Sequence, residues 1–199
     1  MWFAVLALIP LAYLAGTFPS AQRVARRHGI DVMATGSGNP GASNVGRLLG
    51  RRAGVTVFAL DALKGALPAL AGALMVGRGS GLILGGAALA GHVFPATRGW
   101  RGGKGVATAG GVCAMLYPAV GVVAIGLWLV LAKATRKASL ASLIATLAVP
   151  TGLLATGRPW GELAGVGAMA ALIVLRHRAN LARLVRGGEL ALTDAAPRA

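Results

Sequence analysis

The fold of this chain depends on residues 106–132, which read VATAGGVCAMLYPAVGVVAIGLWLVLA. The stretch carries no charged residue, and Pro118 lies near its middle. Proline lacks the backbone donor and clashes with the preceding turn, so it kinks or ends a helix. Two readings follow: one kinked helix over residues 106–132, or two short helices that break at Tyr117 and Pro118.

Similar apolar runs fill most of the chain and identify its class. Of the 199 residues, 56% are hydrophobic and 13% are charged, whereas soluble domains are about a quarter charged. Uncharged runs of about twenty residues predict helices that cross a bilayer. The first run is followed rather than preceded by arginines, so it predicts a permanent span and not a signal peptide. We expect spans at residues 2–20, 53–76, 80–96, 106–117, 118–132, 138–156 and 160–176.

The positive charges decide between one helix and two over residues 106–132. With two helices the basic residues collect on one side of the membrane, with only Arg78 and Arg158 opposite and Lys64 inside a span. Merging the helices would divide the charges evenly, whereas basic residues concentrate in cytoplasmic loops. The cytoplasmic set is Arg23, Arg26, Arg27, Arg47, Arg51, Arg52, Arg98, Arg101, Lys104, Lys133, Arg136, Lys137, Arg176, Arg178, Arg183, Arg186 and Arg198.

The expected fold is therefore an all-α polytopic integral membrane protein with seven transmembrane helices. Its amino terminus lies outside and its carboxyl terminus in the cytoplasm, and residues 1–199 form a single membrane-embedded domain. The formal net charge of +15 follows from the positive-inside pattern and does not indicate nucleic acid binding. The single Cys113 lies in an apolar run and is expected to be inert packing.

The loop that follows the first span is built to hold an anion. Residues 35–47 read TGSGNPGASNVGR and contain no carboxylate. Glycines without a Cβ let backbone N–H groups converge on an oxyanion. The stretch spells GxGxxG, but no strand precedes it and Pro40 interrupts it, so a dinucleotide site is not indicated. The candidate ligands are Ser37, Gly38, Asn39, Gly41, Ser43, Asn44 and Arg47, with Arg51 one helical turn further on.

A second glycine loop lies between the third and fourth expected spans. Gly102, Gly103, Lys104 and Gly105 differ from a Walker A motif because no Ser or Thr follows the lysine, so a nucleotide is not indicated. A glycine loop that opens a helix offers free N–H groups and a positive dipole to a phosphate, with Lys104 as a point charge.

Further polar residues are expected on the same cytoplasmic side or inside a span. His177 and Asn180 share a face if the last span continues as a helix. Glu189 can anchor an arginine of the basic stripe Arg176, Arg183 and Arg186, and Ser142 adds a hydroxyl near the start of the sixth span. Asp61 and Lys64 are three residues apart within the second span and predict a structural ion pair.

Taken together, these motifs resemble the bacterial acyl-phosphate:glycerol-3-phosphate acyltransferase family, known as PlsY, over nearly the full length. The resemblance rests on residues 37–47, Asp61-x-x-Lys-Gly65, Gly91-His-x-Phe-Pro95, residues 102–108, and His177-Arg-x-Asn180 with Gly187 and Glu189. It departs at Ser43, where the family commonly has threonine, and at Lys137, where an aromatic is common.

The resemblance implies a seven-span enzyme of phospholipid synthesis in the bacterial cytoplasmic (inner) membrane, with its active site facing the cytoplasm. It would transfer a fatty acyl group from acyl phosphate to the 1-hydroxyl of glycerol 3-phosphate, giving lysophosphatidic acid and inorganic phosphate. Neither a metal nor a cofactor is expected, and the partners are these two substrates and membrane lipids. The implied catalytic set is Ser37, Arg47, Lys104, His177 and Asn180. The implied phosphate-binding set is Gly38, Asn39, Gly41, Ser43, Asn44, Arg51, Gly102, Gly103, Gly105 and Ser142. Glu189 would serve structural integrity.

The chemistry leaves alternatives open. His177 could remove the hydroxyl proton as general base, or a substrate phosphate oxygen could take it while His177 and Asn180 only position groups. We favour the second because nearby cations would lower the basicity of the ring. A covalent acyl-Ser37 is a third route. A transporter for an organic phosphate and a non-catalytic lipid-binding scaffold are the rival classes.

Overall fold

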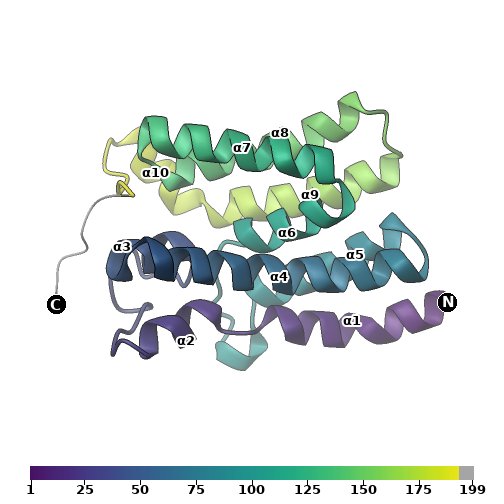
Figure 1. Ribbon diagram of the computed structural model, residues 1–199, viewed down its shortest axis with the longest axis horizontal. Helices are drawn as coiled ribbons and strands as arrows, with labels where there is room; N and C mark the ends of the chain where they lie inside the picture. The colour runs from purple at the N-terminus through teal and green to yellow at the C-terminus, as the bar shows by residue number, and fades with distance from the viewer. Residues whose placement is uncertain (193–199) are drawn as a thin grey trace.

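The computed structural model describes residues 1–192, and helices are the only regular structure in that part of the chain. They pack as one elongated bundle (Figure 1). The helices are α1 (Trp2–Gly16), α2 (Ser20–Arg26), α3 (Ala42–Leu49), α4 (Arg51–Met75), α5 (Arg78–Val93), η1 (Ala96–Arg98), α6 (Val106–Leu116), α7 (Pro118–Thr135), α8 (Ala138–Ala155), α9 (Trp160–Arg176) and α10 (Arg178–Val185).

Residues 106–132 form two helices, as the charge pattern predicts. α6 ends at Leu116 and α7 begins at Pro118, where proline at the first helical position costs no intrahelical hydrogen bond. The chain reverses direction there, and the two helices pack closely: a β-carbon on Gly121 would lie 2.6 Å from the Cα of Ala114. α7 runs to Thr135, somewhat further than expected.

The first expected span, residues 2–20, is not one continuous helix. α1 stops at Gly16, and α2 starts at Ser20 after a break over Thr17, Phe18 and Pro19. Proline disfavours helical backbone in the residue before it, so Phe18 cannot continue α1. The seven helical runs of the sequence prediction are otherwise present, and the count of seven spans stays a prediction.

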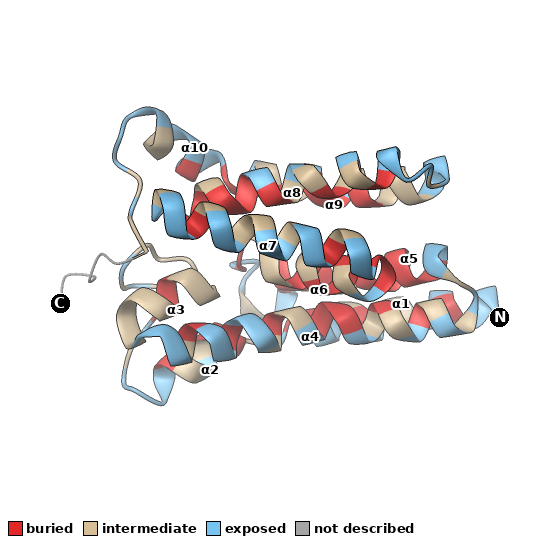
Figure 2. Cartoon of the chain, turned by 45° about the horizontal axis from the view of Figure 1, so that its top comes forward, coloured by how far each residue is buried: buried red, intermediate tan, exposed pale blue. Residues whose placement is uncertain are grey.

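Five stretches are long and apolar enough to cross a membrane, and α6 is a shorter apolar helix. The stretches are Trp2–Arg26, Arg51–Met75, Arg78–Arg98, Pro118–Thr135 and Ala138–Ala155. Buried residues gather where α4, α5 and α6 meet, whereas α7 is mostly exposed (Figure 2). Its exposed side carries residues such as Val122 and Val130, which suit contact with lipid tails.

Glycine allows α4 and α6 to approach each other closely. A β-carbon on Gly65 would overlap the carbonyl oxygen of Thr108, and one on Gly111 would overlap that of Ala62. Small residues at helix crossings are typical of membrane bundles, in which packing rather than water exclusion holds helices together. This crossing holds α6 tightly against α4.

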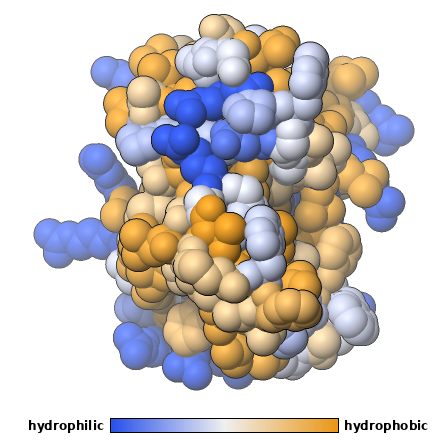
Figure 3. Space-filling model, turned by 90° about the vertical axis from the view of Figure 1, so that its right-hand side faces the viewer, coloured by the Kyte–Doolittle hydropathy of each residue, from blue (hydrophilic) through white to orange (hydrophobic). Residues whose placement is uncertain are grey.

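The two ends of the bundle differ in charge. α3, α10 and the α7–α8 connection lie at one end, and the amino terminus lies at the other (Figure 1). The amino-terminal end is largely hydrophobic around one hydrophilic patch (Figure 3). Arg78 and Arg158 both contact the α6–α7 turn there: Arg78 Nε donates to the Leu116 carbonyl at 3.2 Å, and the Arg158 guanidinium lies 5.7 Å from the Tyr117 ring centroid. The two arginines that the sequence separates from the others thus share one end.

At the opposite end, α3 folds back on α4. Gly50, with φ +86°, separates the two helices, and a β-carbon on Gly54 would lie 2.9 Å from the Cα of Gly46. A small apolar core joins α2, α3 and the first turns of α4 (Ala21, Ala25, Val32, Val45 and Val57). Arg47 lies in the last turn of α3 and Arg51 begins α4, with the break at Gly50 between them. The expectation that they follow each other on one helical turn is therefore wrong.

Candidate active site

The first glycine loop is organised by Asn44, whose side chain is 1% exposed. Its Oδ1 accepts from the backbone N–H of Ser37 at 3.0 Å, and its Nδ2 donates to the carbonyls of Thr35 (3.0 Å) and Val32 (3.3 Å). Gly36 has φ +66°, and a β-carbon there would overlap Asn44 Oδ1. The amide of Asn44, predicted to bind phosphate, is therefore used to shape the loop.

The rest of this loop leads into α3 with backbone suited to an anion. Gly38 has φ +67°, which glycine adopts without strain. Gly41 is extended at the N-cap of α3, and a β-carbon there would lie 2.9 Å from Asn39 Nδ2. Ser43 lies in the first turn of α3. Ser37, Gly38 and Asn39 together form one wall of a hollow that lies between this loop and the second glycine loop.

The second glycine loop lies on His92 of α5. The N–H of Gly103 donates to the His92 carbonyl at 3.2 Å. β-Carbons on Gly102 and Gly103 would overlap the backbone and the imidazole of His92, respectively. Gly105, with φ +90°, caps the start of α6. The predicted loop at a helix N-terminus is therefore present, and close packing explains its glycines.

Lys104 and Asn180, two members of the catalytic set that the resemblance implies, are in direct contact. Lys104 Nζ donates to Asn180 Oδ1, and Asn180 Nδ2 donates to Glu189 Oε1. Glu189 Oε2 also accepts from Arg183 Nε at 2.9 Å, which confirms that Glu189 anchors an arginine. One chain of contacts thus joins the second loop, α10 and the segment after it.

His177 breaks the last helix instead of continuing it. α9 ends at Arg176 and α10 begins at Arg178, yet His177 and Asn180 are both buried, at 2% and 3% exposure. The Nδ1 of His177 lies 2.8 Å from the carbonyl of Ile173. A carbonyl accepts only from a protonated nitrogen, so this contact places the proton of the neutral ring on Nδ1 and leaves Nε2 with a lone pair.

The electrostatics of this cluster are set by burial. Burial lowers the pKa of Lys104 to about 8; Glu189 raises it, and Arg183, Arg47 and Arg176 lower it. Burial also lowers the pKa of His177 to about 4. The hydrogen bond to Ile173 raises this pKa, and repulsion from Lys104 lowers it further. Near neutral pH, Lys104 is mostly charged and His177 is neutral.

A hollow of about 400 Å³ separates the two glycine loops. Of the predicted site residues, Ser37, Gly38, Asn39 and Gly102 line it. The remaining lining residues are Met33, Pro40, Trp100, Arg101 and Arg176. Trp100 has φ +64°, a conformation uncommon outside glycine, which turns the chain at the rim.

Arg176 lines the hollow, so it does more than belong to the basic stripe that it was expected to form with Arg183 and Arg186. Its Nη2 donates to the Gly102 carbonyl at 3.2 Å, and its guanidinium lies 5.8 Å from the Phe94 ring centroid. The sequence places Arg176 among four arginines over residues 176–186 and gives no signal that singles it out. Arg101, beside Gly102, could have been found from its position in the glycine loop.

The remaining predicted residues lie at different distances from this centre. Arg47 is near enough to Lys104 to lower its pKa. Arg51 is exposed at the start of α4. Ser142 is buried between α7 and α8, where its Oγ accepts from Trp128 Nε1 at 3.0 Å. No group of three or more His, Cys, Asp or Glu side chains in residues 1–192 is placed to hold a metal ion.

The sequence matches the family model for glycerol-3-phosphate acyltransferase over residues 6–187. A glycerol-3-phosphate acyltransferase of Aquifex aeolicus is 41% identical over 92% of this chain and 96% of the relative. One from Rhizobium meliloti is 43% identical over 94% and 91%, respectively.

Solved structures resemble the chain throughout. The crystal structure of PlsY (YgiH), an integral membrane glycerol 3-phosphate acyltransferase, in its glycerol 3-phosphate form superposes with a TM-score of 0.91 and is 39% identical, covering 94% of this chain and 95% of that one. The lysophosphatidic acid form gives 0.89 at the same identity and coverage.

Proposed function

Because this chain belongs to the glycerol-3-phosphate acyltransferase family, we propose that it transfers a fatty acyl group from acyl phosphate to the 1-hydroxyl of glycerol 3-phosphate. The products are lysophosphatidic acid and inorganic phosphate. Family membership makes the chain an acyltransferase of phospholipid synthesis and an integral membrane protein, which rules out the transporter and scaffold readings. What we propose beyond family membership is the acyl phosphate donor, the roles of the site residues and the orientation of the chain in the membrane.

One observation carries the proposal: two carboxylate-free glycine loops face each other across a hollow beside a half-buried lysine, Lys104. Both reactants are phosphates, so a site with converging N–H groups and cations suits both. Acyl phosphate already contains a good leaving group. The protein must then mainly align the substrates and stabilise developing negative charge, which requires no nucleophile triad.

The roles of the site residues follow from their positions. The backbone N–H groups of Asn39 and Gly102 hold phosphate oxygens, with Lys104 and Arg47 as cations. Gly38 and Gly103 shape the two loops, because their N–H groups donate to the carbonyls of Thr35 and His92. Ser37 donates from the wall of the hollow. Gly41, Ser43 and Gly105 complete the phosphate contacts, and Asn44 and Ser142 support them. Arg51, exposed at the start of α4, attracts the phosphate without binding it directly. Asn180 orients Lys104, because its amide accepts from the lysine while donating to Glu189.

A substrate phosphate, and not His177, takes the proton of the attacking hydroxyl. A base works best when its pKa lies near the working pH, whereas His177 has a pKa of about 4. The second pKa of a phosphate monoester is about 6, which makes it the stronger base. The Nε2 of His177 can still accept a hydrogen bond from the hydroxyl and aim it at the acyl carbon.

In the membrane, the seven apolar helices each cross or enter the bilayer, with the amino terminus outside. The end that carries the site faces the cytoplasm of the bacterial inner membrane, in accord with its arginines. Residues 1–199 act as one membrane-embedded domain. The acyl donor reaches the site from the bilayer and glycerol 3-phosphate from the water.

The test is a reconstituted assay with purified protein, palmitoyl phosphate and glycerol 3-phosphate. We expect phosphate release and a lysophosphatidic acid product that both require the two substrates together. Palmitoyl-CoA and palmitoyl-acyl-carrier protein serve as alternative donors at equal concentration. Turnover with either of these but not with the acyl phosphate would refute the proposed donor while leaving the family activity intact.

His177→Gln tests the base separately. Glutamine can accept a hydrogen bond but cannot act as a base, so a variant within a few-fold of wild type supports the substrate phosphate. Near-total loss of turnover with unchanged binding of glycerol 3-phosphate would identify His177 as the base. Incubation with radiolabelled acyl phosphate alone tests the covalent route, which predicts a label on Ser37.

A further inference from the structure

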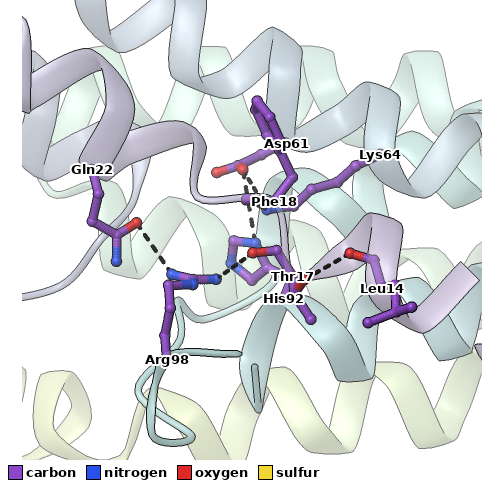
Figure 4. Close-up of polar contacts among 8 residues, drawn as sticks. All are labelled: Leu14, Thr17, Phe18, Gln22, Asp61, Lys64, His92 and Arg98. Atoms are coloured by element: carbon purple, nitrogen blue, oxygen red, sulfur yellow. Dashed lines mark hydrogen bonds and ion pairs between the residues drawn. The ribbon is translucent and has the colours of Figure 1, made fainter. Parts of the chain in front are cut away.

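A buried charged cluster lies outside the proposed site and takes no part in the chemistry described so far. It consists of Asp61 and Lys64 of α4, His92 of α5 and Arg98 of η1, and it surrounds the break between α1 and α2 (Figure 4). The side chains of Asp61, Lys64 and His92 are 3–8% exposed.

Asp61 and Lys64 form the predicted ion pair, with 2.7 Å between Lys64 Nζ and Asp61 Oδ1. Lys64 also donates to the carbonyl of Phe18 at 3.1 Å, in the break between α1 and α2, where the N–H of Ser20 is the carbonyl's other donor. A buried ion pair is weak evidence for stability, because well-packed apolar residues often replace one without loss. The role of the Asp61–Lys64 pair therefore lies in the groups that it holds in position.

Arg98 ties the segment after α5 to the same break. Its Nη2 donates to the Thr17 carbonyl at 3.0 Å, and its Nη1 donates to Gln22 Oε1 at 3.1 Å. Gln22 belongs to α2, which leads into the first glycine loop, whereas Arg98 leads into the second. One guanidinium thus connects the two chain segments whose loops form opposite walls of the hollow.

His92 forms the floor of the second loop. Its carbonyl accepts from the Gly103 N–H, its Nδ1 lies 3.8 Å from Asp61 Oδ1, and its ring fills the space that a β-carbon on Gly103 would need. Asp61 therefore contacts Lys64, which lies at the break between α1 and α2, and also His92, which lies beneath the second glycine loop.

The geometry points to His92 and Arg98 as positioning residues that set the distance between the two phosphate-holding loops. Neither touches a reacting atom. His92 supports Gly103, and with it the neighbouring Lys104, from below, while Arg98 fixes the loop against α2. This inference rests on the proposed function, because it assigns the two residues to the phosphate site of that reaction.

A double-mutant cycle between His92 and Gly103 tests the contact. Gly103→Ala alone places a methyl group against the imidazole and should raise KM for glycerol 3-phosphate about tenfold or more. His92→Ala removes both the support and the clash. The double variant should then bind glycerol 3-phosphate several-fold more tightly than the product of the single effects predicts. Additive effects would show that the ring does not act on the loop.

Arg98 offers a milder variant where His92→Ala fails to fold. Arg98→Met should raise KM about tenfold with a smaller change in kcat, and Arg98→Lys, which keeps one donor, should recover part of the loss. Gly111→Ala, at the α4–α6 crossing, is the structural control: it lowers the melting temperature in detergent and leaves KM near wild type. A fall in melting temperature without a change in KM for the Arg98 variants would reduce the cluster to a structural role.

Calorimetric binding of glycerol 3-phosphate to the same proteins separates this inference from the proposed function. It requires no acyl donor, so weakened binding in the variants supports positioning even if another donor proves correct. Wild-type protein that binds glycerol 3-phosphate, together with variants that bind it equally well, would overturn the inference and leave the reaction untouched.

Discussion

Raising the pH should inactivate the enzyme through one lysine. Burial lowers the pKa of Lys104 from 10.5 to about 8; Glu189 opposes the shift, and three arginines add to it. About 90% of molecules then carry the charge at pH 7 and about 10% at pH 9. Because the charged form is the one that holds a phosphate, kcat/KM for glycerol 3-phosphate should fall about tenfold per pH unit above 8.

The assay is phosphate release from palmitoyl phosphate at low glycerol 3-phosphate, from about pH 6 to pH 10, corrected for hydrolysis without enzyme. Loss of activity on the acid side belongs to the substrate, whose second phosphate pKa is about 6. A bound anion stabilises the charged lysine, so the alkaline limb of kcat should lie at higher pH than that of kcat/KM.

Lys104→Arg is the matched control. The guanidinium stays charged throughout this range, so the alkaline limb should disappear even if the variant is slower overall. A flat wild-type profile up to pH 10 would refute the reasoning. An alkaline limb that is unchanged in Lys104→Arg would assign the limb to a different group.

Three further predictions use the same contacts. Glu189→Gln removes a negative charge that raises the pKa of Lys104, so the alkaline limb should move to lower pH; an unmoved limb would contradict that coupling. Gly111→Ala should lower the free energy of unfolding by about 1–3 kcal/mol, because the new β-carbon meets a carbonyl of α4. Gly110→Ala lies in the same helix with open space around it and should raise the free energy of unfolding by up to about 1 kcal/mol. Thermal unfolding in detergent compares the two variants. Asn44→Ala leaves the N–H of Ser37 and the carbonyls of Thr35 and Val32 without their partner. It should lower the free energy of unfolding by about 3 kcal/mol and abolish most of the activity. Wild-type stability would contradict the organising role of Asn44.

Hydropathy and charge locate the helices well, because each depends on long runs of residues. The break at Pro118 and the separation of Arg78 and Arg158 from the other cations follow in the same way. The end of α1 and the whole of α3 were missed, because they depend on single positions such as Pro19 and Gly50. Short helices beside a membrane bundle leave almost no periodic signal.

The candidate site residues stand out in the sequence as motifs, but the separate role of each residue could not be read from it. Lys104, Asn180 and Glu189 form a chain of contacts that requires α6, α10 and the segment after α10 to meet. Arg176 looked like its neighbouring arginines, and only the end of α9 brings it over Gly102. Asn44 looked like a phosphate ligand until its three backbone partners were located.

The length of α4 before the buried cluster has a consequence for capture of the soluble substrate. Asp61, beneath the second loop, lies ten residues (61 − 51) after the start of α4, or about 15 Å along the helix. Arg51 and Arg52 are exposed at that start. The Debye length is about 10 Å at 0.1 M salt, so these rim arginines act on a phosphate approaching the end of α4 more than on groups at the depth of Asp61. They raise the local concentration of anions at the mouth of the site, and salt lowers it. Supply of glycerol 3-phosphate should therefore depend on ionic strength, whereas turnover at saturation should not.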